Sequence, residues 1–176
     1  MILGPTMHEL LEYTEWERSN WFEWMRHQER PVLEVAAGPS ADGRFQKIGE
    51  LVRHIFSGEK RYVERLLDLP MTDTSAVPVA DLDSLFEFGR QSRQELREFI
   101  GRLNPEDSET PRRFTMGNSS LTASSRKIVT HVLMHEIRHW AQIATLLRLS
   151  GFKVGFHDFL FSPVMGGELR RESQSA

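Results

Sequence analysis

The stretch that decides the fold runs from Ser124 to Gly151 and reads SSRKIVTHVLMHEIRHWAQIATLLRLSG. Apolar residues and histidines recur in it at steps of three and four, the spacing that brings side chains to one face of an α-helix. A serine at its start and Gly151 at its end are typical of the residues that cap helices. We therefore predict a helix that starts at Ser124 or Ser125 and ends at Ser150.

Three more segments have helical periodicity, and the breaks between them are rich in Pro, Gly, Ser and Thr. Prolines follow the expected helix ends, since proline cannot continue a helix. The expected helices run from about Met7 to Gln28, from about Gly43 to Leu69, and from the N-cap Asp81 to about Leu103.

Four helices without a clear strand pair predict an all-α fold, a four-helix bundle in a single domain over residues 1–167. The loops after the first and third helices are longer than tight hairpins need, so the threading need not be up-down-up-down. Within the third loop, Arg113–Met116 is expected to form a short extended piece that turns at Gly117. Residues 152–165 are expected to pack back on the bundle with one short helical turn, and residues 168–176 to be disordered.

Composition excludes several kinds of protein. The chain has 176 residues, of which 39% are hydrophobic and 27% charged, as in soluble globular proteins. A formal net charge of −3 and basic residues that form pairs, such as Arg112 and Arg113, but no long runs argue against nucleic acid as a partner. No run approaches the roughly 18 apolar residues of a membrane span, and no signal peptide is recognised, so we expect a cytoplasmic protein with no membrane partner. Without cysteine, any thiol chemistry needs a thiol that arrives with a substrate.

Two histidines in the quoted stretch have the spacing of metal ligands. His135 and His139 lie four residues apart, which places their β-carbons about 5–6 Å from each other on a helix. A metal ion would satisfy two imidazoles that are costly to bury without partners. The same pair could instead be structural or exposed, with no metal. The seam that would carry the pair to the core comprises Ile128, Val132, His135, His139, Gln142 and Leu146.

A third ligand has to come from another helix, and His54 is the best candidate. It lies about 120° from the centre of the apolar stripe of its own helix, so periodicity alone does not place it inside. Gly58, one turn further, suggests that something needs room there. Glu59 falls on the apolar stripe and could be a hydrogen-bond partner of a histidine or a proton carrier. His131 extends the histidine ladder and is open to three roles: a ligand, a hydrogen-bonding neighbour or a solvated residue.

The sequence resembles the DinB/YfiT-like family. The segment from His131 to Ile143, with Leu147, Arg148 and Gly151 after it, is similar to the last-helix signature of that family. The segment from Leu51 to Phe56, followed by Glu59, is similar to its second-helix segment, and Tyr13–Trp16 fits its usual start. The resemblance implies a four-helix bundle, often a homodimer, in which His54, His135 and His139 bind one divalent metal ion.

Relatives in this family include transferases and isomerases that use low-molecular-weight thiols such as bacillithiol or mycothiol. The resemblance therefore implies a thiol S-transferase of the detoxification type that acts on an electrophilic small molecule, with Glu59 or His131 handling protons. The alternative is a stress-associated metal-binding protein without turnover. Zinc or nickel is the expected ion, with iron or manganese as alternatives. The tryptophans Trp16, Trp21 and Trp24 are expected to form core or dimer contacts.

Overall fold

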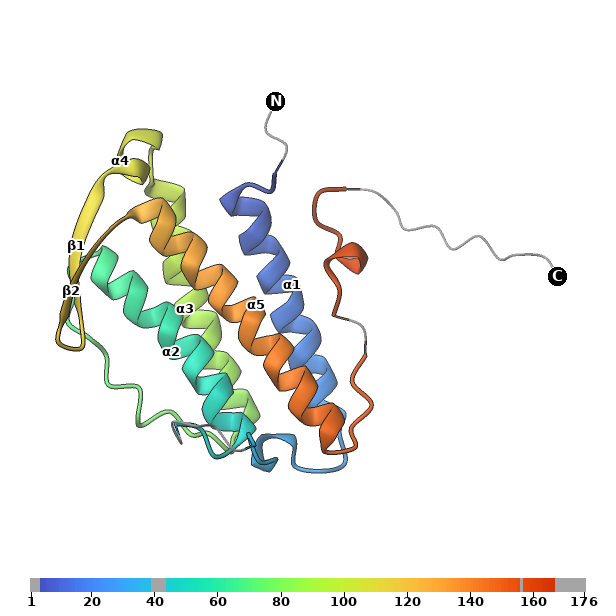
Figure 1. Ribbon diagram of the computed structural model, residues 1–176. Helices are drawn as coiled ribbons and strands as arrows, with labels where there is room; N and C mark the ends of the chain where they lie inside the picture. The colour runs from blue at the N-terminus through green and yellow to red at the C-terminus, as the bar shows by residue number, and fades with distance from the viewer. Residues whose placement is uncertain (1–3, 39–43, 156, 167–176) are drawn as a thin grey trace, which may run out of the picture.

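More than half of the described residues lie in four long helices. The computed structural model describes residues 4–38, 44–155 and 157–166. The long helices lie side by side in Figure 1, which confirms the prediction of a mostly helical protein. They are α1 (Met7–Arg26), α2 (Ile48–Leu66), α3 (Leu82–Arg102) and α5 (Ser125–Leu149). The shorter elements are η1 (Val32–Glu34), α4 (Pro105–Glu109), β1 (Pro111–Met116), β2 (Ser119–Ser124) and η2 (Phe159–Phe161).

The helix ends follow their local capping residues. The Thr6 hydroxyl accepts a hydrogen bond from the backbone N–H of Glu9 and so caps α1. Asp81 caps α3 and Ser124 caps α5 in the same way, as the sequence predicted. Gly151 has a φ of +81°, the left-handed conformation in which glycine commonly terminates helices.

The second helix begins later than predicted. Lys47 is extended and forms an isolated antiparallel bridge with Ala36, so the residues just before Ile48 pair with another segment instead of continuing the helix. The predicted start, Gly43, lies outside the described residues. The helix also ends at Leu66 and not at Leu69, because Asp68 adopts a positive φ of 54° that stops the helix.

A β-hairpin corrects the expectation that the fold contains no strand pair. Strands β1 and β2 pair antiparallel with Phe114 opposite Leu121, and Gly117 at their turn has a φ of +57°. The extended piece and its turn were predicted, but its partner strand was not. Phe114 and Ala123 pack against the apolar core, which gives one face of the hairpin a reason to form.

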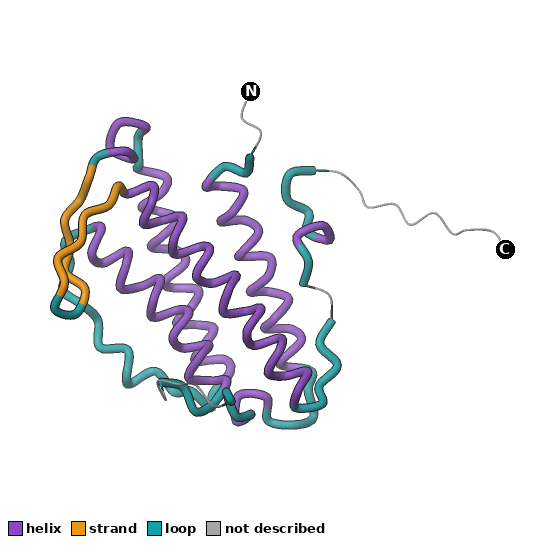
Figure 2. The backbone as a smooth tube through the Cα atoms, in the orientation of Figure 1, coloured by secondary structure: helices purple, strands orange, loops and turns teal. Residues whose placement is uncertain are grey.

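The segment after α2 decides how the helices are threaded. Arg61 donates to the Thr74 hydroxyl and Arg53 to the Ser75 carbonyl, so the chain beyond Leu67 returns along α2 toward its start. As a result α2 and α3 point in the same direction, as the colour gradient in Figure 1 shows, and the connecting loop is drawn in teal beside α2 in Figure 2. The loops after the first and third helices are long, as predicted, but this crossover follows the second helix.

The last described residues pack against α1, as predicted. The Trp24 indole donates to the Lys153 carbonyl at 3.2 Å, and the Trp21 ring stacks on His157 with the ring centroids 4.1 Å apart. Trp21 is fully buried in the core, Trp24 is partly buried against it, and Trp16 stacks on Tyr13 at 6.0 Å. The short helical turn expected here is η2, whereas the disorder expected for residues 168–176 concerns a segment outside the described residues.

The interior consists of two apolar clusters with a layer of charge between them. One cluster is built around Trp21, Phe56 and Trp140, and the other around Leu11 and Leu133. Between the two clusters, each long helix contributes one buried charged residue. These four residues are Arg18 from α1, Glu59 from α2, Arg93 from α3 and Glu136 from α5.

The four charged residues neutralise one another. Glu136 accepts from Arg18 at 2.6 and 2.8 Å and also from Arg93, while Glu59 lies 3.1 Å from Arg18 and 2.9 Å from Arg93. Burial alone would raise the pKa of Glu136, but the two guanidinium groups outweigh it and hold that pKa below its usual value. Two cations thus face two anions in the middle of the molecule.

Glu17, one residue before Arg18, is a buried carboxyl group without such compensation. Burial, reinforced by the negative charge of Glu136, raises the pKa of Glu17 to about 8. Above pH 4.5 the unfolded chain loses this proton while the folded protein keeps it, so the free energy of unfolding falls as the pH rises to about 8. We expect Glu17→Gln to stabilise the protein at pH 8, by on the order of a few kcal/mol, and to have little effect at pH 4.

Urea unfolding at pH 4 and pH 8 measures this difference. The substitution changes the slope of the free energy of unfolding against pH only if Glu17 keeps its proton in the folded protein. Glu23→Gln is the matched control, because Glu23 lies on the same helix and is exposed. An equal effect of the two substitutions at pH 8 would contradict the prediction.

Candidate metal centre

Three histidine side chains from two helices converge on one point. The Nε2 atom of His135 lies 3.1 Å from the Nε2 atom of His54 and 3.1 Å from that of His139. His54 comes from α2, and the other two come from successive turns of α5. The three ligand atoms all lie within 4.8 Å of one another. His139 is buried and the other two are half-buried.

The spacing of these nitrogens fits a metal ion. Two imidazole nitrogens that each lie about 2.0–2.1 Å from a tetrahedral ion are about 3.3 Å apart, close to the 3.1 Å that separates His135 Nε2 from each of the other two. Hydrogen bonds cannot satisfy all three nitrogens, because the Nε2 atom of His135 has one proton or one lone pair to share with two neighbours. A shared cation satisfies all three. The residues present therefore fit a divalent ion bound by His54, His135 and His139.

The side chain of Gln142 determines which ring nitrogen of His139 carries the proton. Its side-chain oxygen lies 3.0 Å from His139 Nδ1, which places the ring proton on Nδ1 and leaves the Nε2 lone pair for a metal ion. The sequence analysis counted Gln142 only as part of the apolar seam. Its position three residues after a candidate ligand was the signal for this role.

The environment keeps all three imidazoles neutral. Burial, the neighbouring His139 and three arginines lower the pKa of His54 to about 4. Burial and the adjacent histidines lower the pKa of His135 to about 3, and burial also lowers the pKa of His139. Neutral imidazole is the form that binds metals, so no proton has to be removed at neutral pH.

The predicted seam of α5 is displaced from the true core. Leu133, Glu136 and Trp140 are almost fully buried, whereas Gln142 is exposed. The centre of the buried face therefore lies one residue away from the predicted seam, and the histidines lie at its border. This position leaves the candidate site within reach of solvent.

Gly58 makes room for His135, as its place in the sequence suggested. A β-carbon at this position would lie 3.3 Å from His135 Cε1 and 3.6 Å from Nδ1. We expect Gly58→Ala to displace the ring and to weaken metal binding roughly 10-fold, the lower end of effects for residues that support a ligand. The metal-free protein should gain up to about 1 kcal/mol, because alanine favours helix.

Metal titration measures the expected loss of affinity, and thermal unfolding of the metal-free protein measures the expected gain in stability. Gly101→Ala on α3 is the control, because nothing lies within 4 Å of a β-carbon there. If both variants bind metal as tightly as the wild-type protein, Gly58 has no role in positioning His135.

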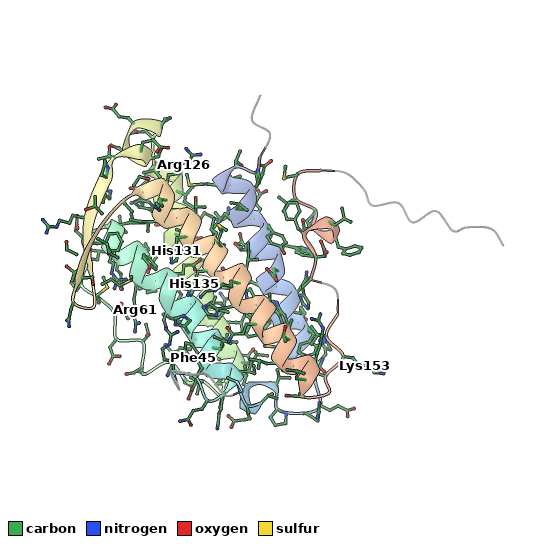
Figure 3. All side chains as sticks on the ribbon, viewed as in Figure 1. Phe45, Arg61, Arg126, His131, His135 and Lys153 are labelled. Atoms are coloured by element: carbon green, nitrogen blue, oxygen red, sulfur yellow. The ribbon has the colours of Figure 1, made fainter. Side chains whose placement is uncertain are left out.

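The two residues predicted to handle protons lie in different environments. Glu59 is buried, with its partners Arg18 and Arg93 in the charged layer. His131 is exposed, with its ring 5.9 Å from that of His135 and 5.3 Å from that of Tyr62. Figure 3 labels His131 and His135 along α5. Their roles in proton transfer stay predictions.

Two pockets reach the histidine cluster. One, of about 840 Å³, is lined by His131, Met134 and His135 together with residues near the start of α5. The other, of about 370 Å³, is lined by His54 and by polar residues of α2 and the crossover segment. Each of these spaces is thus lined by one of the three histidines that could hold a metal ion.

The fold and the site define a mostly helical protein with a candidate three-histidine metal centre. A model of the DinB family matches residues 4–170. The chain therefore belongs to the DinB family, as the resemblance of its histidine segments implied. No curated protein matches it. None of the helices in the described ranges combines the length and the apolar content that crossing a bilayer requires.

Proposed function

We propose that this DinB-family protein is a metal-dependent enzyme that transfers a low-molecular-weight thiol to an electrophilic small molecule. The observation that carries the proposal is the convergence of the Nε2 atoms of His54, His135 and His139. Three imidazoles leave at least one coordination position for a substrate. The three histidines would hold a divalent ion, zinc or nickel before iron or manganese, whose positive charge would lower the pKa of a thiol bound beside it.

The protein's own residues support a reaction with two substrates. The chain has no cysteine, so the reacting sulfur belongs to a substrate. His54 lines one pocket and His135 the other, which supports a reaction in which two substrates approach the candidate metal centre from different sides. In the reaction the S–H bond of the thiol breaks, a sulfur–carbon bond forms, and the leaving group departs from the electrophile.

A proton acceptor is needed for the thiol proton, and we assign this role to His131. It lines the same pocket as His135 and is exposed, so it can pass the proton to water. Glu59, the other predicted carrier, lies between two arginines instead.

We also propose that the four long helices form the bundle implied by the resemblance and that the protein is a homodimer.

The proposal is tested by incubating metal-loaded protein with several biological thiols and the electrophile monochlorobimane. We expect conjugation above the uncatalysed rate with at least one thiol, and loss of that rate in His135→Ala. His8→Ala is the control, because His8 is an exposed histidine on α1 outside the cluster. A wild-type rate no better than that of His135→Ala for every thiol would favour a metal-binding protein without turnover.

A further inference from the structure

The pocket beside His54 is lined mainly by polar and charged side chains. One stripe of α2 supplies His54, Ser57 and Arg61 at steps of three and four residues. The crossover segment closes the pocket from the other side with Thr74 and Ser75. This arrangement explains why His54 lies off the apolar stripe of its helix: it faces this pocket and not the core.

Ser57 is a buried polar group without a partner. Its side chain is only 4% exposed, and its hydroxyl has no hydrogen-bond partner among the described residues. A buried hydroxyl that lacks a partner destabilises the free protein, and a bound ligand that supplies a partner removes this cost. Ser57 lies within one turn of His54, next to the candidate metal centre.

Arginines outnumber carboxylates in the lining of the pocket. Arg44, Arg53 and Arg61 line it, against two carboxylates, Glu50 and Asp73. Neither Arg53 nor Arg61 forms an ion pair within the part of the chain that the structure describes, because their hydrogen bonds go to Ser75 and Val77 carbonyls and to the Thr74 hydroxyl.

The two carboxylates are engaged with the backbone. Glu50 accepts from the N–H of Gln46 at 2.7 Å, and Asp73 accepts from the N–H of Ser75 at 2.9 Å. The guanidinium groups of Arg53 and Arg61 therefore hold neutral partners, and a bound metal ion would add further positive charge. Such a space attracts an anion.

We propose that this pocket binds a carboxylate group of the thiol substrate, through Arg53, Arg61 and the Ser57 hydroxyl, while the sulfur reaches the metal centre. The volume of about 370 Å³ lies at the lower end of small-molecule sites, which suits a small acid. The inference rests on the proposed function and adds to it the chemical class of the thiol: a carboxylate-bearing one.

Binding of three probes to the zinc-loaded protein tests the inference by calorimetry. Mercaptosuccinate carries both a thiol and carboxylates, 2-mercaptoethanol carries only the thiol, and succinate only the carboxylates. We expect mercaptosuccinate to bind at least about 10-fold tighter than 2-mercaptoethanol, because hydrogen bonds to charged groups contribute this much or more.

Substitutions in α2 test whether the residues of this pocket bind the carboxylate group. Arg61→Gln should weaken mercaptosuccinate and succinate about 10- to 100-fold and leave 2-mercaptoethanol unchanged. Arg65→Gln, one turn further along α2 and outside the pocket, should leave all three probes within about twofold. Ser57→Ala should also weaken mercaptosuccinate while making the free protein no less stable, a pair of results that a purely structural role would not produce.

Equal binding of mercaptosuccinate and 2-mercaptoethanol, or an equal loss of both in Arg61→Gln, would overturn the inference. Tighter binding of inorganic phosphate than of succinate would overturn the assignment to carboxylates. Zinc content and conjugation rate are measured on the same samples, and they report on the proposed function separately. Succinate binding that depends on Arg61 supports the subsite even if no thiol is turned over.

Discussion

Replacing His135 by alanine is expected to abolish stoichiometric metal binding. Its Nε2 atom is the one that lies 3.1 Å from both other nitrogens, so its loss leaves His54 and His139 without the atom between them. Removing a residue that merely supports a ligand costs about 10- to 100-fold in affinity, and removing a ligand should cost more. Elemental analysis of protein purified without a nickel column measures the effect, and the stabilisation by added metal should disappear with it.

Two further variants should lose bound metal to different extents. His54→Ala should remove the metal as His135→Ala does, whereas Gln142→Ala should weaken binding about 10- to 100-fold without removing it, since Gln142 only orients His139. His8→Ala should retain the full metal content. Full occupancy in both His54→Ala and His135→Ala would show that the ligands are assigned wrongly.

The second large effect is expected in the charged layer, where Glu136→Ala should destabilise the protein by about 3–5 kcal/mol. This carboxylate is 1% exposed and accepts from Arg18, Arg93 and the Trp140 indole. Without it two buried guanidinium groups share the single carboxylate of Glu59. The loss is a large part of the total of about 5–15 kcal/mol typical of a domain.

Equilibrium unfolding in urea measures this loss. The control is Glu109→Ala, which breaks an ion pair of 2.8 Å with Arg126 in which both side chains are more than half exposed. Exposed pairs contribute up to about 1 kcal/mol, so the two variants should differ clearly. If Glu136→Ala costs no more than Glu109→Ala, the charged layer does not stabilise the fold.

The helices could be predicted because their signals are local. Asp81, Ser124 and Gly151 act on residues within one turn, and the structure uses each of them as expected. The hairpin was only half predicted, since the turn at Gly117 is a local signal but the pairing of β1 with β2 depends on packing of Phe114 against the core.

The candidate site was predictable to a different degree on each helix. His135 and His139 share a helix, and their spacing alone brings them together. His54 lies 81 residues from His135 in the chain, and its own periodicity pointed away from the core. Its neighbours Gly58 and Glu59 made it a candidate, and the resemblance to the DinB family implied it as a ligand.

By itself, the sequence determined the four long helices, the caps of α3 and α5 and the histidine pair on α5, because these depend on residues a few positions apart. The tertiary structure decided the rest. It brought Arg18 to Glu136 across 118 residues, and it laid the crossover segment along α2 so that His54 faces a polar pocket. The physical reason is that a buried charge or an unpaired nitrogen is stable only beside its partner, and which partner lies there depends on how the helices pack.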